Sequence, residues 1–110
     1  MRYLMLVCGV EPEGEFSEED YKAGVLWGEE MDRRGVRLEG HRLRPSASAT
    51  TVRVRNGEML ASDGPFAETN EQILGFDLLE CANLDEAIEV AAKHPVAALG
   101  SLEIRPLWTD

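Results

Sequence analysis

Residues 50–66 read TTVRVRNGEMLASDGPF, and this stretch decides the fold of the chain. Residues 51–55 alternate in the way of a β-strand, in which successive side chains point to opposite faces. Asn56 and Gly57 follow, a pair that favours the type I′ turn of a β-hairpin. Residues 58–62 then return as the partner strand. The pattern predicts a hairpin with one buried face and one solvent-exposed face.

The chain before this hairpin predicts a strand, a helix and a second strand. Residues 3–8 are an apolar run of strand length, which indicates a strand buried on both faces. Ser17 is expected to begin the helix, because its hydroxyl can accept from the backbone N–H of Asp20. Gly35 suits the C-terminal stop, and residues 36–43 read as the second strand.

The first helix is expected to turn one side toward the sheet. Its predicted inner face has loosely helical spacing and consists of Tyr21, Gly24, Val25, Gly28 and Met31. Phe16 and Tyr21 also have the spacing of a hydrophobic staple across the start of the helix.

The chain after the hairpin repeats the strand–helix–strand order. Residues 73–81 predict a strand with Leu74, Phe76 and Leu78 on one side. Asn83 can cap a second helix, Pro95 ends it, and residues 101–106 alternate as a last strand. The apolar stripe of this helix is predicted to be Leu84, Ala87, Ile88, Ala91 and Ala92.

The resulting order is β-α-β, hairpin, β-α-β, in a single α+β domain over residues 1–110. Two helices cover one face of such a sheet at most, yet the first strand looks buried on both faces. The simplest cover for the second face is another copy of the chain. The sequence therefore predicts a homodimer with two sheets face to face.

Composition and charge exclude several classes of function. The net charge of -10 argues against general affinity for nucleic acid. No run of about 18 apolar residues occurs, so no membrane span is expected. The apolar run near the N-terminus is shorter than the roughly 7–15 residues of a signal peptide core, which predicts a cytoplasmic protein.

The two cysteines predict neither a metal site nor a redox motif. Cys8 and Cys81 are far apart and lack metal-ligand spacing. Both fall in predicted strands, where a buried free thiol is usual, and a disulfide would require the two strands to be neighbours. The two separated histidines and scattered carboxylates do not suggest a metal either. No P-loop or dinucleotide fingerprint is present, so no cofactor is expected.

The positive charge is concentrated in one segment. Seven of the eleven basic residues lie between Arg33 and Arg55, where only Glu39 opposes them, so the segment carries +6 and the rest of the chain -16. One interpretation is a solvated basic face that balances an acidic one. The other is a cradle for a small anionic ligand, or a face for an acidic partner.

The turn at residues 63–66 has two interpretations of its own. Asp63, Gly64 and the proline after them are turn formers, so the segment can simply be a connection. A functional interpretation is favoured because Phe66 is an aromatic residue in a polar stretch, and because Glu68 and its neighbours supply a dense set of polar groups.

Several separate blocks of the chain carry a family resemblance. These blocks are residues 49–54 (ATTVRV), 63–69 (DGPFAET), 71–72 (EQ), 85–88 (DEAI), 94–95 (HP) and 103–106 (EIRP). Together they resemble the YCII-related family, in particular its DGPF branch, over nearly the whole chain. Asn70 departs from the pattern, which usually has lysine there; if that lysine binds an anion, this chain binds it less well.

The resemblance implies a ferredoxin-like fold with an inserted hairpin, which dimerises as an α+β barrel and leaves a cleft between sheet and hairpin. Function is largely undefined across the family. A His–Asp pair has been suggested to act in related proteins, and some bacterial DGPF members accompany extracytoplasmic-function sigma factors.

Two hypotheses for function follow. In the first, the protein is an enzyme acting on an anionic metabolite, with His41 as general acid or base and Asp63 as its orienting partner. The expected ligand-binding residues are Arg53, Gly64, Phe66 and Glu68. In the second, it is a non-catalytic regulatory or accessory dimer, with a possible sigma-factor partner.

The histidines also have plainer interpretations. His41 can be a surface residue of the second strand, because contact with Asp63 cannot be read from sequence. His94 stands just before Pro95, where it is expected to interact with the C-terminus of the second helix and not with a substrate.

Overall fold

A computed structural model describes residues 1–12 and 17–109 of the chain. Its strands are β1 (Arg2–Gly9), β2 (Arg37–Arg42), β3 (Thr50–Arg55), β4 (Glu58–Asp63), β5 (Gln72–Glu80) and β6 (Ser101–Pro106). Its helices are α1 (Glu18–Arg33) and α2 (Leu84–Ala92), with short 3-10 helices η1 (Ser46–Ser48) and η2 (Pro95–Ala98). The order of strands and helices is the one that the sequence predicts.

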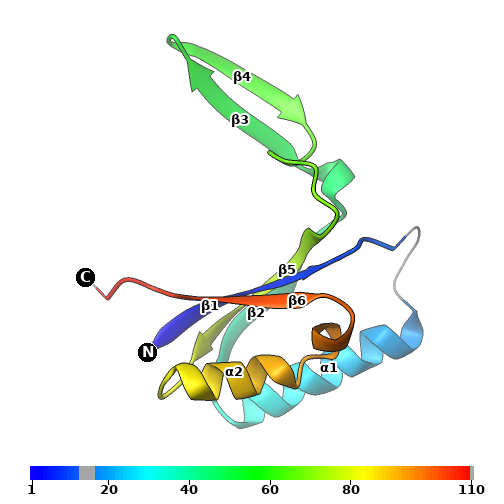
Figure 1. Ribbon diagram of the computed structural model, residues 1–110, viewed down its shortest axis with the longest axis vertical. Coiled ribbons are helices and arrows are strands. Elements are labelled where there is room, and N and C mark those ends of the chain that lie inside the picture. Colours follow the sequence, from blue (N-terminus) through cyan, green and yellow to red (C-terminus); the bar gives the residue numbers. More distant parts are fainter. Residues whose placement is uncertain (13–16, 110) are drawn as a thin grey trace.

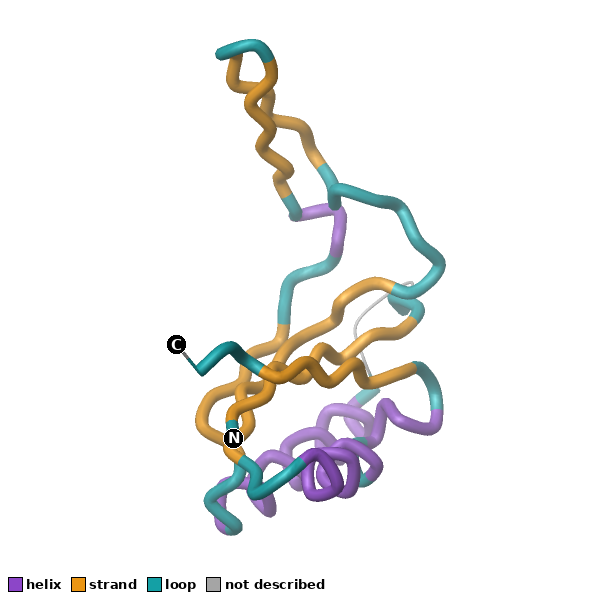
Figure 2. The backbone as a smooth tube through the Cα atoms, turned by 60° about the vertical axis from the view of Figure 1, so that its left-hand side comes forward, coloured by secondary structure: helices purple, strands orange, loops and turns teal. Residues whose placement is uncertain are grey.

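The strands form two separate sheets. Four of them make an antiparallel sheet in the order β2-β5-β1-β6, and β3 pairs with β4 alone. Both helices cover one face of the larger sheet, and the β3–β4 hairpin projects away on the other side (Figures 1 and 2). The arrangement is compatible with a ferredoxin-like α+β fold. We call the sheet surface away from the helices the open face.

In β1, the residues under the helices and the residues on the open face differ in burial. Tyr3, Met5 and Val7 are buried in the core beneath the helices. Leu4 and Leu6 point to the open face and are only half-buried. The prediction that this strand is buried on both faces is therefore wrong for the single chain, because none of the described elements covers the open face.

The ends of α1 confirm the sequence signals. The Ser17 hydroxyl oxygen accepts from the Asp20 backbone N–H at 3.1 Å, which satisfies one of the free donors of the first turn. Gly35 follows the C-terminal residue of the helix with φ 71°. Phe16, and with it the predicted staple, lies outside the described residues.

The inner face of α1 differs from the predicted one. Gly28 and Met31 are buried as expected, but Tyr21 and Val25 are 52% and 41% exposed. Trp27, which the spacing missed, is buried instead, and its indole N–H donates to the Val90 carbonyl at 3.0 Å. That carbonyl belongs to the last turn of α2, where the helix itself offers no donor, so this bond fixes how the helices face each other.

The contact between Trp27 and Val90 also determines which face of α2 is buried. Ala87, Val90 and Ala91 are buried, whereas Leu84 and Ile88 are about half-exposed. The predicted stripe was therefore wrong at Leu84, Ile88 and Ala92, which is also exposed, and it missed Val90. The predicted cap is confirmed, since the side chain of the residue before the helix, Asn83, accepts from a backbone N–H of its first turn.

In the hairpin, the predicted turn is confirmed but the predicted buried face is not. Asn56 and Gly57 have φ values of 53° and 78°, as a type I′ turn requires. However, Val52, Val54 and Met59 are all about 60–65% exposed. The prediction of a buried side is wrong for the single chain, because no other described element packs on the hairpin (Figure 2).

Polar contacts fix the base of the hairpin. The Glu11 carboxylate, just after β1, accepts from the Ser46 backbone N–H at 2.7 Å and from its hydroxyl at 2.9 Å. On the other side, the Gly64 N–H donates to the Ala49 carbonyl at 2.7 Å, and the Thr51 hydroxyl donates to the Gly64 carbonyl at 2.8 Å. The turn formers at residues 63–65 thus have a structural role.

Among the described residues, no helix combines the length and the apolarity needed to cross a membrane.

Candidate functional site

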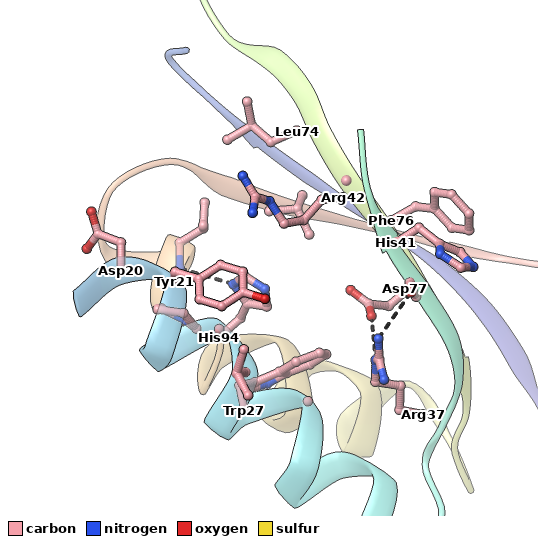
Figure 3. A pocket seen from close by; sticks show the side chains of 18 of the residues that line it. Asp20, Tyr21, Trp27, Arg37, His41, Arg42, Leu74, Phe76, Asp77 and His94 are labelled. Atoms are coloured by element: carbon pink, nitrogen blue, oxygen red, sulfur yellow. Dashed lines mark hydrogen bonds and ion pairs between the residues drawn. The ribbon is translucent and has the colours of Figure 1, made fainter. Parts of the chain in front are cut away.

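A cavity of about 450 Å³ lies between α1, η2 and the strands β2 and β5 (Figure 3). This volume is within the usual range for small-molecule sites. Its apolar wall includes Val25, Trp27, Leu74 and Val96. It therefore lies on the helix-covered side of the sheet, away from the hairpin.

Leu74 reaches this wall because of an irregularity in β5. Val7 pairs with Gly75 and Cys8 pairs with Ile73, so Leu74 is an extra residue in β5. Such a bulge changes the side to which a strand residue points. Leu74 packs against the core beneath the helices. The prediction that it shares a side with Phe76 is thus wrong.

One end of the cavity holds a buried ion pair. The Arg37 Nε donates to Asp77 Oδ1 at 2.8 Å, and its Nη1 lies 3.2 Å from both carboxylate oxygens of Asp32. Asp77 is only 6% exposed. A bulge in β2 at Leu38 lets the side chain of Arg37 face the helices. Figure 3 shows the side chains of Arg37 and Asp77 pointing toward each other.

Burial and the hydrogen bonds of the pair act in opposite directions on the pKa of each partner. Burial raises the pKa of the Asp77 carboxyl, and the hydrogen bond from Arg37 opposes that rise. The hydrogen bond to Asp77 in turn raises the pKa of Arg37, despite the desolvation of the guanidinium. The close approach of the two partners needs a glycine at position 40, because a Cβ atom on Gly40 would collide with Asp77 Oδ1. The glycine at this position therefore permits the pair.

His94 lines the cavity from the start of η2. Its Nδ1 accepts from the Val96 backbone N–H at 3.1 Å, so the ring proton is on Nε2. The ring meets Trp27 edge to face, with centroids 4.7 Å apart. Burial lowers the pKa of His94 to about 4, so the imidazole is neutral at pH 7. The expected interaction with the C-terminus of α2 is wrong, because this side chain caps η2.

The predicted catalytic pair does not meet within one chain. His41 pairs across the sheet with Phe76, their rings 5.7 Å apart, and both residues contribute to the lining of the cavity. Figure 3 shows their side chains pointing away from Asp77. The His41 Nε2 is 2.9 Å from Glu39 Oε1. Asp63 ends β4 in the separate hairpin, and within residues 1–12 and 17–109 no hydrogen bond or ion pair joins it to His41.

The predicted ligand-binding residues are also spread out. Arg53 pairs with Leu60 on one face of the hairpin, and Asp63 lies on the other face. Phe66 is 78% exposed, and Glu68 is exposed beyond the hairpin. The structure therefore brings none of these residues into the cavity.

The basic segment is equally dispersed. Arg34 binds Glu89 at 3.0 Å and Arg37 binds Asp77, while Arg53 and its neighbours extend along the hairpin. Within one chain these arginines do not form a common cradle for an anion.

Sequence reasoning named His41, which contributes to the lining of the cavity, but missed its other polar groups. Arg37, Asp77 and His94 come from three separate elements, and only tertiary folding brings them together. One signal was available for Asp77: a lone carboxylate within the apolar run ILGFDLL (residues 73–79) requires a partner if the strand is buried. No comparable signal marks His94.

Nucleophilic and metal chemistry find little support among the described residues. Both cysteines are free, and burial raises the pKa of each thiol, which keeps it protonated and weakly nucleophilic. Within residues 1–12 and 17–109, no group of three or more His, Cys, Asp or Glu residues is placed to hold a metal ion.

Comparison with known proteins identifies the family. The uncharacterised protein R00369 of Rhizobium meliloti (strain 1021) is 52% identical to this chain over 68 residues, which cover 60% of this chain and 55% of that protein. The match therefore spans about half the length of that relative. The pattern of the YCII-related domain matches residues 1–109, and the chain belongs to the YCII-related domain family.

Proposed function

We propose that this chain is a small-molecule-binding domain whose ligand occupies the cavity between α1, η2 and the β2–β5 strands. The observation that carries the proposal is the composition of this cavity. Trp27 and Leu74 give it apolar walls, and the buried Asp77 and the half-buried His94 give it fixed points of recognition. Concave apolar sites with a few well-placed polar groups are the usual form of ligand pockets.

The cavity supports binding better than proton transfer. Arg37 is engaged by two carboxylates, and the neutral His94 uses Nδ1 to accept a backbone hydrogen bond. A general acid or base works best with a pKa near the operating pH, and His94 is well below it.

Trp27 makes the proposal testable without a known ligand. The chain has two tryptophans, and the other, Trp108, is 93% exposed, so Trp108→Phe leaves Trp27 as the reporter at the cavity wall. We expect a metabolite library to contain compounds that change Trp27 emission and raise the unfolding temperature, because a ligand that binds only the folded state stabilises it.

A matched pair of variants locates the binding. Val25→Phe adds bulk to the cavity wall, and Leu26→Phe adds the same kind of bulk at a neighbouring exposed position outside the cavity. Binding should be lost in the first variant and kept in the second. Hits that survive Val25→Phe unchanged would show that the ligand binds elsewhere.

A second proposal concerns the open face and the hairpin, and it belongs with the DGPF branch that the sequence of residues 63–66 favours. The open face carries His41 beside half-buried Phe76, and Asp63 shares a hairpin face with the exposed Val52 and Met59. A lone two-stranded hairpin is marginal in water. We propose that two copies bury these apolar faces together as a dimeric α+β barrel, with His41 of one copy near Asp63 of the other.

Sedimentation at micromolar concentration and a double-mutant cycle test this dimer. His41→Ala and Asp63→Asn should each weaken dimerisation, and together by less than the sum, because residues in contact couple by about 0.5–3 kcal/mol. Arg53→Ala, on the other hairpin face, is the control and should be additive with His41→Ala. A monomer at this concentration, or additive effects of the pair, would contradict the proposal.

A further inference from the structure

The His94 imidazole in the cavity wall uses only one of its two ring nitrogens in hydrogen bonds within the described residues. Because His94 Nδ1 accepts from the Val96 N–H, Nε2 carries a proton that can be donated. Among the hydrogen bonds of residues 1–12 and 17–109, none uses this Nε2–H. A half-buried donor without a protein partner is satisfied by water or by a ligand acceptor.

The charges around the cavity decide which acceptor suits this donor. The charged lining residues are Asp20, Glu29, Asp32, Arg37, Arg42 and Asp77. Carboxylates therefore outnumber guanidiniums by two in this lining. Arg37 is committed to Asp32 and Asp77, and the Arg42 guanidinium lies over the Tyr21 ring at 5.4 Å from its centroid. A bound anion would meet a net negative lining.

A bound cation is disfavoured for a different reason. An ammonium group has donors and no acceptor, so beside the Nε2–H of His94 it would place two donors face to face. The walls near His94 are also apolar, with Trp27 and Val96 in contact with the ring or next to it. Burying an unpaired charge there carries a large desolvation cost.

We infer that the ligand of this cavity is an uncharged, partly apolar molecule whose carbonyl-type oxygen accepts a hydrogen bond from His94 Nε2. The inference rests on the proposed function, since it specifies the ligand class of the same site. The hydrogen bond from the Val96 N–H sets the tautomer of His94, and the Trp27 ring packs against the imidazole. At this point of the cavity the His94 ring thereby offers a donor only, which selects acceptors over donors.

Four small aromatic probes separate the possible classes. Benzamide offers a neutral carbonyl, benzoate a negative charge, benzylamine a positive charge at pH 7.5, and toluene no polar group. In the Trp108→Phe protein, we expect benzamide to bind at least about tenfold more tightly than benzoate or benzylamine, because the charged probes leave a buried group unpaired. Trp27 emission and ligand-observed NMR measure the affinities.

Variants of His94 test the donor itself. His94→Phe keeps an aromatic ring against Trp27 but removes the donor, and it should lower benzamide affinity about tenfold while toluene affinity changes little. His94→Gln restores a donor and should recover part of the benzamide affinity. Urea denaturation of both variants checks that they are folded.

The outcomes separate the two proposals. If none of the four probes binds at the cavity of the Trp108→Phe protein, the proposed function fails and this inference fails with it. If probes bind but benzoate equals benzamide, or if His94→Phe leaves benzamide affinity unchanged, this inference is overturned while small-molecule binding stands.

Discussion

The helix-backed sheet and the β3–β4 hairpin are built from similar strands but stabilised in different ways. In the sheet, Met5 and Leu79 are fully buried beneath the helices. In the hairpin, Val54 and Met59 face each other across the strands and are both at least 60% exposed. Local turn chemistry defines the hairpin, whereas burial of apolar surface stabilises the sheet. A clear sequence signal for a strand pair thus says little about how much that pair contributes to stability.

Two methionines test this contrast most strongly. Met31→Ala empties a fully buried position in α1 and should lower the free energy of unfolding by about 2–5 kcal/mol. Met59→Ala removes the same side chain from a position 65% exposed on the hairpin and should cost less than about 0.5 kcal/mol. Urea denaturation at low protein concentration measures both. Equal losses would show that the hairpin is packed against something in solution.

A pair of glycines tests the buried ion pair in the same region. A Cβ on Gly40 would collide with Asp77 Oδ1, so Gly40→Ala should displace the carboxylate from Arg37 and cost about 2–3 kcal/mol. Gly24 in α1 has no atom within 4 Å of its added Cβ. Gly24→Ala should instead stabilise the protein by about 0.5–1 kcal/mol. A neutral Gly40→Ala in urea denaturation would mean that the pair contributes little.

His94 predicts how the helix-backed region responds to acid. Its pKa is about 4 in the folded protein and is expected near 6.5 after unfolding, so the unfolded chain binds the extra proton. The stability due to neutral His94 is fully present above pH 6.5 and is lost as the pH falls toward 4. The full difference corresponds to about 3 kcal/mol, which the partial exposure of the ring reduces to about 1–2 kcal/mol.

Urea denaturation between pH 4 and 7 measures this loss. His94→Gln removes the titrating group and should flatten the pH dependence of stability in that range. If the free energy of unfolding falls equally with pH in both proteins, the acid sensitivity is due to groups other than His94.

The smallest expected effects come from two glycines with similar backbone conformations. Gly35 after α1 and Gly57 in the hairpin turn have φ values of 71° and 78°, with nothing near the added Cβ. Alanine in this left-handed region costs about 1–2 kcal/mol locally. Gly35→Ala should lower global stability by about 1 kcal/mol. Gly57→Ala should change it by less than about 0.5 kcal/mol, while NMR amide shifts of the hairpin move toward random-coil values.

The sequence predicted the parts of the fold that local chemistry determines. Ser17, Asn83 and the Asn56-Gly57 turn mark element ends correctly because each acts on backbone groups a few residues away. The faces of the helices were predicted less well, because the bond from Trp27 to the Val90 carbonyl depends on how α1 and α2 pack.

The candidate site was harder to predict for the same reason. His94 is 57 positions from Arg37 and joins it at one cavity only through the tertiary fold. The bulge that turns Leu74 into that cavity leaves no mark in the alternation of β5. Phe66, which draws attention in the sequence, lies beyond the hairpin and is exposed in the single chain.

The carboxylate of Glu11 at the base of the hairpin has a mechanical consequence. A strand of six residues is about 20 Å long, so a small rotation of the hairpin about η1 displaces its tip by a larger distance. A rotation of about 10° at Ser46 shifts the tip at Gly57 by about 3–4 Å, which is close to the distance between two heavy atoms in contact. The two hydrogen bonds from Ser46 to Glu11 therefore set where that tip reaches.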